Sequence, residues 1–189
     1  QINGYTVVDA STVVTTHINH LIHMHAAELL GRQELQKLLD HLNAQFPKLI
    51  EDLVPKLLPL STVQKVLHNL LEENVHIRDM RTIIDVLTEY AAQTQDAIEL
   101  TAVVRTALGR AIVDQFYPAG SEVQVMSLHH DLENILGHVM QTGGGQGAGI
   151  EPGLADTLLR EARSAAQQQE KLGLPMVLLA PGSIRFLLA

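Results

Sequence analysis

Residues 61–71 read STVQKVLHNLL, and their apolar side chains recur at the spacing of one helix face. Positions three and four residues apart lie along a single stripe of an α-helix. The members of this stripe are Val63, Val66, Leu67, Leu70 and Leu71. Ser61 and Gln64 have the spacing of a capping box, so Ser61 is predicted to accept a hydrogen bond from a first-turn amide. The stretch therefore predicts a helix that begins at Ser61 and buries one face.

The helical pattern continues upstream of this stretch. Apolar side chains in residues 34–42 repeat at helical spacing, and the pattern stops before Pro47. Proline is tolerated in the first turn of a helix but interrupts its interior. A third, short helix is therefore predicted between Pro47 and Pro55.

Downstream of the opening stretch, two acidic residues mark helix starts. Asp79 precedes an apolar stripe that reaches Leu87, and Asp96 precedes one that runs as far as Val113. Aspartate is a favoured N-cap because its carboxylate accepts from unpaired amides of the first turn. With the upstream helices, residues 31–115 are predicted to form a compact all-helical subdomain.

The N-terminal part predicts one more helix. Residues 5–8 read as a short strand or its remnant, and Asp9 or Ser11 then caps a long helix that runs to about Leu30. Its apolar positions are Val14, Ile18, Leu21, Ile22, Ala26, Leu29 and Leu30. Their spacing predicts that one face of this helix is buried.

Beyond residues 118–120 (PAG), a domain boundary, the pattern changes from helix alone to a mixture of helix and strand. The predicted elements are a strand at 123–128, a helix at 131–141, a glycine-rich loop at 143–149, a helix at 152–172, a buried-type strand at 176–179 and a helix at 183–188. Residues 116–189 are thus predicted to form a smaller α/β subdomain. The fold class as a whole is α+β, predominantly α.

Composition excludes several kinds of partner. The 13 Lys and Arg against 21 Asp and Glu give a net charge of −8, which repels nucleic acid and anionic lipid. Cysteine is absent, so there is no disulfide framework, which fits a reducing compartment. No stretch reaches the roughly 20 apolar residues that span a bilayer. A cytoplasmic location without nucleic acid is expected.

Four histidines form the densest cluster of possible metal ligands: His17, His20, His23 and His25. On a helix that turns about 100° per residue, the first three fan across roughly 120° and His25 points away. At most a neighbouring pair converges, so no metal site is predicted. The glycine run lacks the following Lys-Ser/Thr of a phosphate-binding loop, and no serine has nucleophile-elbow spacing. We expect no enzyme activity, no catalytic residue, no cofactor and no small-molecule substrate.

Two other hypotheses about the function remain open from the residues alone. Residues 61–87, a helix, a short extended piece and a helix, resemble the local pattern of winged-helix DNA readers, but Lys65, Arg78 and Arg81 are few basic groups for a DNA surface. An acidic winged-helix-like regulatory protein is one alternative. A metallohydrolase that uses the histidine cluster is another.

Several short strings are more specific than the helix pattern. They are 4–11 (GYTVVDAS) with Thr16 and His17, 51–55 (EDLVP), 77–83 (IRDMRTI), 99–101 (ELT) with 104–105 (VR), and 151–156 (EPGLAD). In this order they resemble the FlhA (FHIPEP) family of type III export gates. Residues 107–112 (ALGRAI) resemble the flagellar members more than those of virulence type III secretion systems, which remain the alternative within the family.

The resemblance implies a protein with an N-terminal membrane region and four cytoplasmic subdomains at the cytoplasmic face of the bacterial inner membrane. Residues 1–30 would end the first subdomain, residues 31–115 would form the third, and residues 116–189 would form an incomplete fourth. Such proteins form a nonameric ring beneath the export channel. The implied partners are flagellar export chaperones with their substrates, other export-apparatus proteins, and further copies of the chain.

The family's chaperone-docking cleft lies between the first two subdomains, and the resemblance assigns Thr16, beside His17, to it as partner-binding residues. Without the resemblance, Thr16 reads as an exposed helix residue or one that bonds back to a carbonyl one turn earlier. The sequence departs from the family at 56–59 (KLLP), at the extra 146–148 (QGA), and in ending at Ala189 before the final strands. The first helix is accordingly expected to lie exposed or to pack against another copy.

Overall fold

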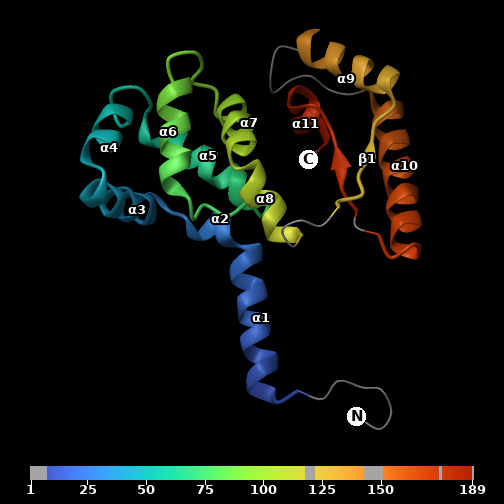
Figure 1. Ribbon diagram of the computed structural model, residues 1–189, viewed down its shortest axis with the longest axis horizontal. Helices are drawn as coiled ribbons and strands as arrows, with labels where there is room; N and C mark the ends of the chain where they lie inside the picture. Colours follow the sequence, from blue (N-terminus) through green and yellow to red (C-terminus); the bar gives the residue numbers. More distant parts are fainter. Residues whose placement is uncertain (1–7, 118–121, 143–150, 175, 189) are drawn as a thin grey trace. The chain divides into compact units, whose positions relative to one another are not determined.

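The computed structural model describes residues 8–117, 122–142, 151–174 and 176–188. Their structure is mostly helical, and contacts divide the chain into two compact units, Gln1–Ile112 and Val113–Ala189 (Figure 1). The predicted boundary at 118–120, the glycine loop at 143–149 and most of the predicted strand at 5–8 lie outside the described residues.

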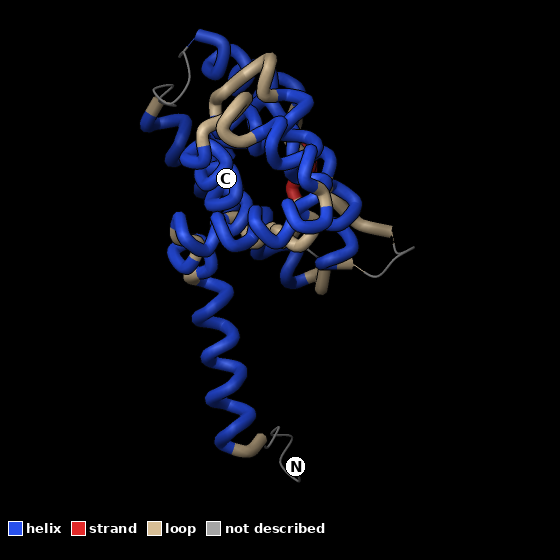
Figure 2. Tube along the Cα trace, turned by 90° about the vertical axis from the view of Figure 1, so that its left-hand side faces the viewer, coloured by secondary structure: helices blue, strands red, loops and turns tan. Residues whose placement is uncertain are grey.

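The first unit is built from helices, which Figure 2 traces as blue tubes. They are α1 (Ala10–Met24), α2 (Ala26–Leu29), α3 (Arg32–Gln45), α4 (Pro47–Leu53), α5 (Leu60–Glu72), α6 (Met80–Tyr90), α7 (Ala97–Ala107) and the first part of α8 (Gly109–Phe116). The short helix predicted after Pro47 is α4, which confirms the proline argument.

The core of this unit gathers around α5, which packs against α7 and α2. Helix α6 packs against α7 and α4, and α3 packs against α4. The largest side chains that are withdrawn from water here are Leu35, Leu39, Leu53, Leu58, Leu67, Leu70, Ile83, Ile84, Leu87 and Leu100. Burying each such side chain is worth roughly 2 kcal/mol. The stripe predicted from residues 61–71 is confirmed, with Leu71 half-buried at its edge.

An ion pair and a cation–π contact are among the polar contacts that join the helices around this core. Arg105 Nη1 on α7 lies 2.5 Å from Glu73 Oε2 at the end of α5. The Arg81 guanidinium of α6 stands 4.7 Å from the centre of the Phe46 ring, at the junction of α3 and α4. The ion pair is partly buried and therefore less screened by solvent than the pairs on the surface.

The predicted capping box is wrong. Helix α5 begins at Leu60, with Pro59 as its N-cap and no side-chain cap, so Ser61 lies inside the helix. The amides of Thr62 and Val63 bond to the Pro59 carbonyl. Proline fixes its own φ in the range that leads into a helix, which moves the start one residue earlier than Ser61. Gln64 is consequently free to bond elsewhere.

The other predicted caps are confirmed, because Asp79 accepts from the amide of Thr82 and Asp96 from that of Ile98. The helix predicted from Asp96 to Val113 is nevertheless two helices, α7 and α8. Leu108 separates them, with a ψ of 1°, and Gly109 follows it. Glycine is a poor helix former, so the chain bends there while Leu108 stays buried.

The long first helix is also interrupted, because His25 has a φ of −107° and separates α1 from α2. Ala27 and Leu30 beyond this break are buried, whereas no residue of α1 is buried. The buried face predicted for residues 14–22 is therefore not covered in this structure. The expectation that the helix lies exposed describes it better.

Asp9, not Ser11, is the N-cap of α1. Its carboxylate accepts from Ser11 Oγ, from the amide of Thr12 at 2.8 Å and from Thr12 Oγ1 at 2.9 Å. The hydrogen bond from Ser11, followed by those from Thr12, lowers the pKa of Asp9 well below its ordinary value.

In its described residues, the second unit contains a small parallel sheet and the helices α9, α10 and α11 beyond α8. Strand β1 (Met126–Ser127) pairs with β2 (Leu178–Leu179), with Met126 opposite Leu178. Helix α9 (His130–Thr142) packs on α11 (Gly182–Leu188), and α10 (Pro152–Lys171) lies between the strands in sequence. Among the residues of this unit that the structure describes, Leu136 and Ile184 are the buried hydrophobic side chains.

The strand predicted at 176–179 was expected to be buried, and this part of the prediction is wrong. Met176 is 64% exposed, and the β2 side chains Leu178 and Leu179 are 44% and 61% exposed. A parallel sheet normally has both faces covered by helices. In the described residues the sheet has two strands, and its β2 side chains remain open to water. Among these residues, no helix combines the length and apolar character that crossing a membrane requires.

The burial of Leu67 in the core predicts how much stability is lost when its side chain is truncated. Leu67→Ala, at a position with 0% exposure, is expected to lower the free energy of unfolding by about 3 kcal/mol, because it removes apolar contacts and leaves a cavity. Leu29→Ala, at a helical position that is 58% exposed, is the matched control and should cost less than about 1 kcal/mol. Urea unfolding followed by circular dichroism measures both. Equal costs would contradict the assigned core.

The cap of α1 predicts a pH dependence. Since folding lowers the pKa of Asp9, its contribution is fully present above the ordinary pKa of 3.8 and is lost as the pH falls through the lowered value. Asp9→Ala is expected to remove this dependence and to reduce helix content in residues 10–16 at neutral pH. Carbon chemical shifts of the Asp9 carboxyl and of those α-carbons measure it. An ordinary titration of Asp9 would contradict the cap.

Candidate functional site

Helix α1 carries the two predicted partner-binding residues, Thr16 and His17, and has no formal charge. Its sequence ASTVVTTHINHLIHM contains no Asp, Glu, Lys or Arg, although the whole chain has a net charge of −8. It is rich in β-branched residues, which form helices less readily than straight-chain ones. An exposed helix of this composition gains little from its own propensity. A covering surface would stabilise it.

One side of α1 is apolar. Val14, Ile18, Leu21 and Ile22 fall at helical spacing, and we call them the apolar stripe. Their exposed fractions are 55%, 50%, 41% and 49%. Exposed apolar side chains that line up along an element are typical of a surface that another protein surface covers.

The opposite side of α1 is uncharged and mostly polar, although the exposed Val13 also lies there. At about 100° per residue, Thr16 lies about 160° around the helix from Ile18, and Thr12, His20 and His23 lie on the same side. We call these four residues the polar face. His17 lies about 100° from Ile18, on the flank between the two sides. The structure thus places both predicted residues on the surface but does not bring them to one face.

The side chain of Thr16 has no partner among the described residues, and its residue is exposed. Four other helical threonines bond back to the carbonyl one turn earlier: Thr88 at 2.8 Å, Thr101 at 2.6 Å, Thr106 at 3.0 Å and Thr157 at 2.9 Å. Such a bond occupies the hydroxyl donor. The Thr16 hydroxyl keeps its donor and its acceptor positions for a partner.

The histidines of this region do not converge on one point. Across the described parts of the chain, no group of three His, Asp or Glu is placed to hold a metal ion. His25 instead pairs with Glu28, with 3.0 Å between Nδ1 and Oε1, at the break between α1 and α2. The four histidines between residues 17 and 25 therefore have no common centre in this structure.

The end of α2 is bonded to α5 close to the place where α1 is attached. This junction was not predicted from the sequence. The Leu30 carbonyl ends α2 and accepts from Gln64 Nε2 at 3.1 Å and from His68 Nε2 at 2.8 Å. Gln64 and His68 are four residues apart, on one edge of α5. That spacing of two polar residues beside an apolar stripe was the available signal.

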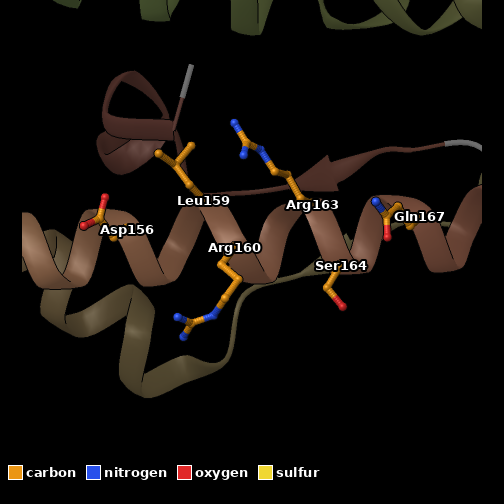
Figure 3. A pocket seen from close by; sticks show the side chains of 6 residues that line it. All are labelled: Asp156, Leu159, Arg160, Arg163, Ser164 and Gln167. Atoms are coloured by element: carbon orange, nitrogen blue, oxygen red, sulfur yellow. The ribbon is translucent and has the colours of Figure 1, made fainter.

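A hollow in the second unit lies along α10. The described residues that line it are Asp156, Leu159, Arg160, Arg163, Ser164 and Gln167 (Figure 3). All six come from this one helix and all are exposed. Arg160 is paired with its neighbour Glu161 at 3.3 Å. A single exposed helix withdraws no polar group from water, so these residues do not form a site for a small molecule.

Known proteins match this chain over its whole length. The sequence model of the FHIPEP family matches residues 1–189. Flagellar biosynthesis protein FlhA of Escherichia coli (strain K12) is 56% identical over 189 residues, which are 100% of this chain and 27% of that protein. FlhA of Bacillus subtilis (strain 168) is 39% identical over 166 residues, 87% of this chain and 24% of that protein. The chain spans about a quarter of the length of these relatives.

Solved structures match as well. A chain in the structure of the Chlamydia pneumoniae CdsV and CdsO protein complex has a TM-score of 0.85 and 25% identity, over 98% of this chain and 55% of that chain. The cryo-EM structure of nonameric EPEC SctV-C has a TM-score of 0.71 and 26% identity, over 90% of this chain and 58% of that chain. The helical fold with its small parallel sheet is consistent with the family match, which covers residues 1–189. The chain therefore belongs to the FHIPEP family.

Proposed function

We propose that this chain is a cytoplasmic part of a flagellar type III protein export gate, where it docks chaperone–substrate complexes and contributes to a ring beneath the membrane export channel. It acts by binding proteins and not by catalysis. Its location is the cytoplasmic face of the bacterial inner membrane. Its partners are flagellar export chaperones with their substrates, other export-apparatus proteins and further copies of itself.

The observation that carries the docking role is the exposed Thr16 hydroxyl on the polar face of α1. When the apolar stripe on the opposite side is covered, Thr16 remains accessible, because the two sides are about half a turn apart. A neutral face without permanent charges suits a hydrogen-bonded contact that does not depend on charge attraction. His17, on the flank, lies where the edge of the same contact would be.

The flagellar assignment rests on the comparison of identities. The FlhA of Escherichia coli is 56% identical to this chain, whereas the CdsV and SctV chains are 25% and 26% identical. The contribution to a ring is supported by the likeness to SctV-C, whose structure is nonameric. The likeness to a chain in the CdsV–CdsO complex supports a second kind of partner within the export apparatus.

Replacing Thr16 tests the docking role. Thr16→Ala is expected to weaken the binding of a flagellar chaperone–substrate complex about tenfold, since one hydrogen bond is worth about 1 kcal/mol or slightly more. Isothermal titration calorimetry measures this on the chain and on a form extended toward the length of its relatives. Thr106→Ala is the matched control, because Thr106 is also exposed on a helix but bonds to its own backbone. Unchanged affinity for Thr16→Ala would refute the assignment of Thr16.

Assembly tests the ring. A form of the chain extended toward the length of its relatives is expected to give species larger than a monomer as its concentration rises. Because a ring assembles by mass action, dilution should reverse this. Sedimentation velocity over a hundredfold range of concentration measures the distribution. A monomer throughout that range would contradict a contribution to a ring.

A further inference from the structure

One carbonyl group ties the N-terminal helices to the core of the first unit. Leu30 is 6% exposed and ends α2, where a helix leaves its last carbonyls without partners. Gln64 Nε2 and His68 Nε2 both donate to the Leu30 oxygen. A carbonyl oxygen only accepts, so His68 carries its proton on Nε2 in this contact. Both acceptor positions of the oxygen are then occupied by side chains of α5.

Helix α1 is connected to this contact through the break at His25. None of its residues is buried, so α1 itself contributes no core packing that would fix its orientation. Backbone bonds continue across the break at His25, from the His25 amide to the Leu21 carbonyl and from the Leu29 amide to the His25 carbonyl. The His25–Glu28 pair spans the same place. The orientation of α2 on α5 therefore also affects the orientation of α1.

Two donors to the Leu30 oxygen constrain the orientation of α2 on α5 more than a single donor would. A single hydrogen bond, together with the apolar contacts of Ala27 and Leu30, would permit α2 to rotate about the bond. Gln64 and His68 approach the same oxygen from successive turns of α5, four residues apart. Rotation of α2 lengthens at least one of the two bonds. Apolar packing alone lacks this directional preference.

We infer that Gln64 and His68 are positioning residues, which hold the Leu30 carbonyl and thereby set the direction of α1 relative to the helical core. Since Thr16 lies on α1, the same two side chains also orient the polar face, which we propose as the docking surface. This second consequence rests on the proposed function. Neither residue needs to touch the partner.

Spin-label distances test the inference without any partner. The chain has no cysteine, so Asn19→Cys on α1 and Glu89→Cys on α6, both exposed, place one label on each side of the junction. The parent is expected to give a narrow distance distribution by double electron–electron resonance. Gln64→Met with His68→Leu removes both donors and keeps apolar bulk. We expect the distribution to broaden at least about twofold as α2 loses its directional bonds.

Two further variants separate positioning from a general loss of stability. His68→Gln in the Gln64→Met background restores one donor at the second position and is expected to narrow the distribution again. Gln36→Met removes an exposed side chain that bonds only to Asp40, at 2.9 Å within α3, and should leave the distribution unchanged. Circular dichroism confirms that each variant is folded. A merely structural role would change the melting temperature without broadening the distances.

The outcomes distinguish the inference from the proposed function. An unchanged distribution in the double variant, or equal broadening in Gln36→Met, would overturn the inference. Broadening together with an approximately tenfold loss of chaperone affinity, recovered by His68→Gln, would support it fully. Broadening without any loss of affinity would leave the two residues as positioning residues for α1 and would overturn their connection with docking. The Thr16→Ala measurement decides the docking role independently.

Discussion

Burial of the apolar face of α5 is the constraint on which the first unit depends. Val63, Val66, Leu67 and Leu70 are withdrawn from water on this helix, and α7 and α2 pack against it. The face is completed by Leu100 and Val104 of α7 and by Leu30 beyond α2. Because so much of the core converges on one helix, α5 determines both which helices pack together and where the N-terminal helices attach.

The polar edge of α5 extends this role from stability to geometry. The same helix that buries its leucines presents Gln64 and His68 to a single carbonyl at the end of α2. A buried carbonyl needs a partner, and here the partners are two side chains on the polar edge of α5. Attachment of α1 and packing of the core are therefore coupled through one helix.

Helix α1 is exposed along its whole length in this structure. Its apolar stripe and its polar face lie on opposite sides, so a protein surface can cover one while the other remains accessible. The chain spans about a quarter of the length of its FlhA relatives. The second unit presents a comparable case, because the β2 side chains of its two-stranded sheet lie open to water.

The sequence by itself determined the predominantly helical character, the members of the core stripe, the caps at Asp79 and Asp96, and the helix after Pro47. These follow from local rules, since periodicity and capping depend on residues within one or two turns. Tertiary structure alone decided the break at His25 and the partner of Gln64, whereas the start of α5 after Pro59 and the break before Gly109 have local causes, the fixed φ of proline and the low helix propensity of glycine. The Gln64 side chain had a plausible local partner at Ser61, yet it bonds to Leu30, 34 residues away in sequence. Local patterns state which groups can bond, whereas only the packed chain determines which distant carbonyl lies within reach.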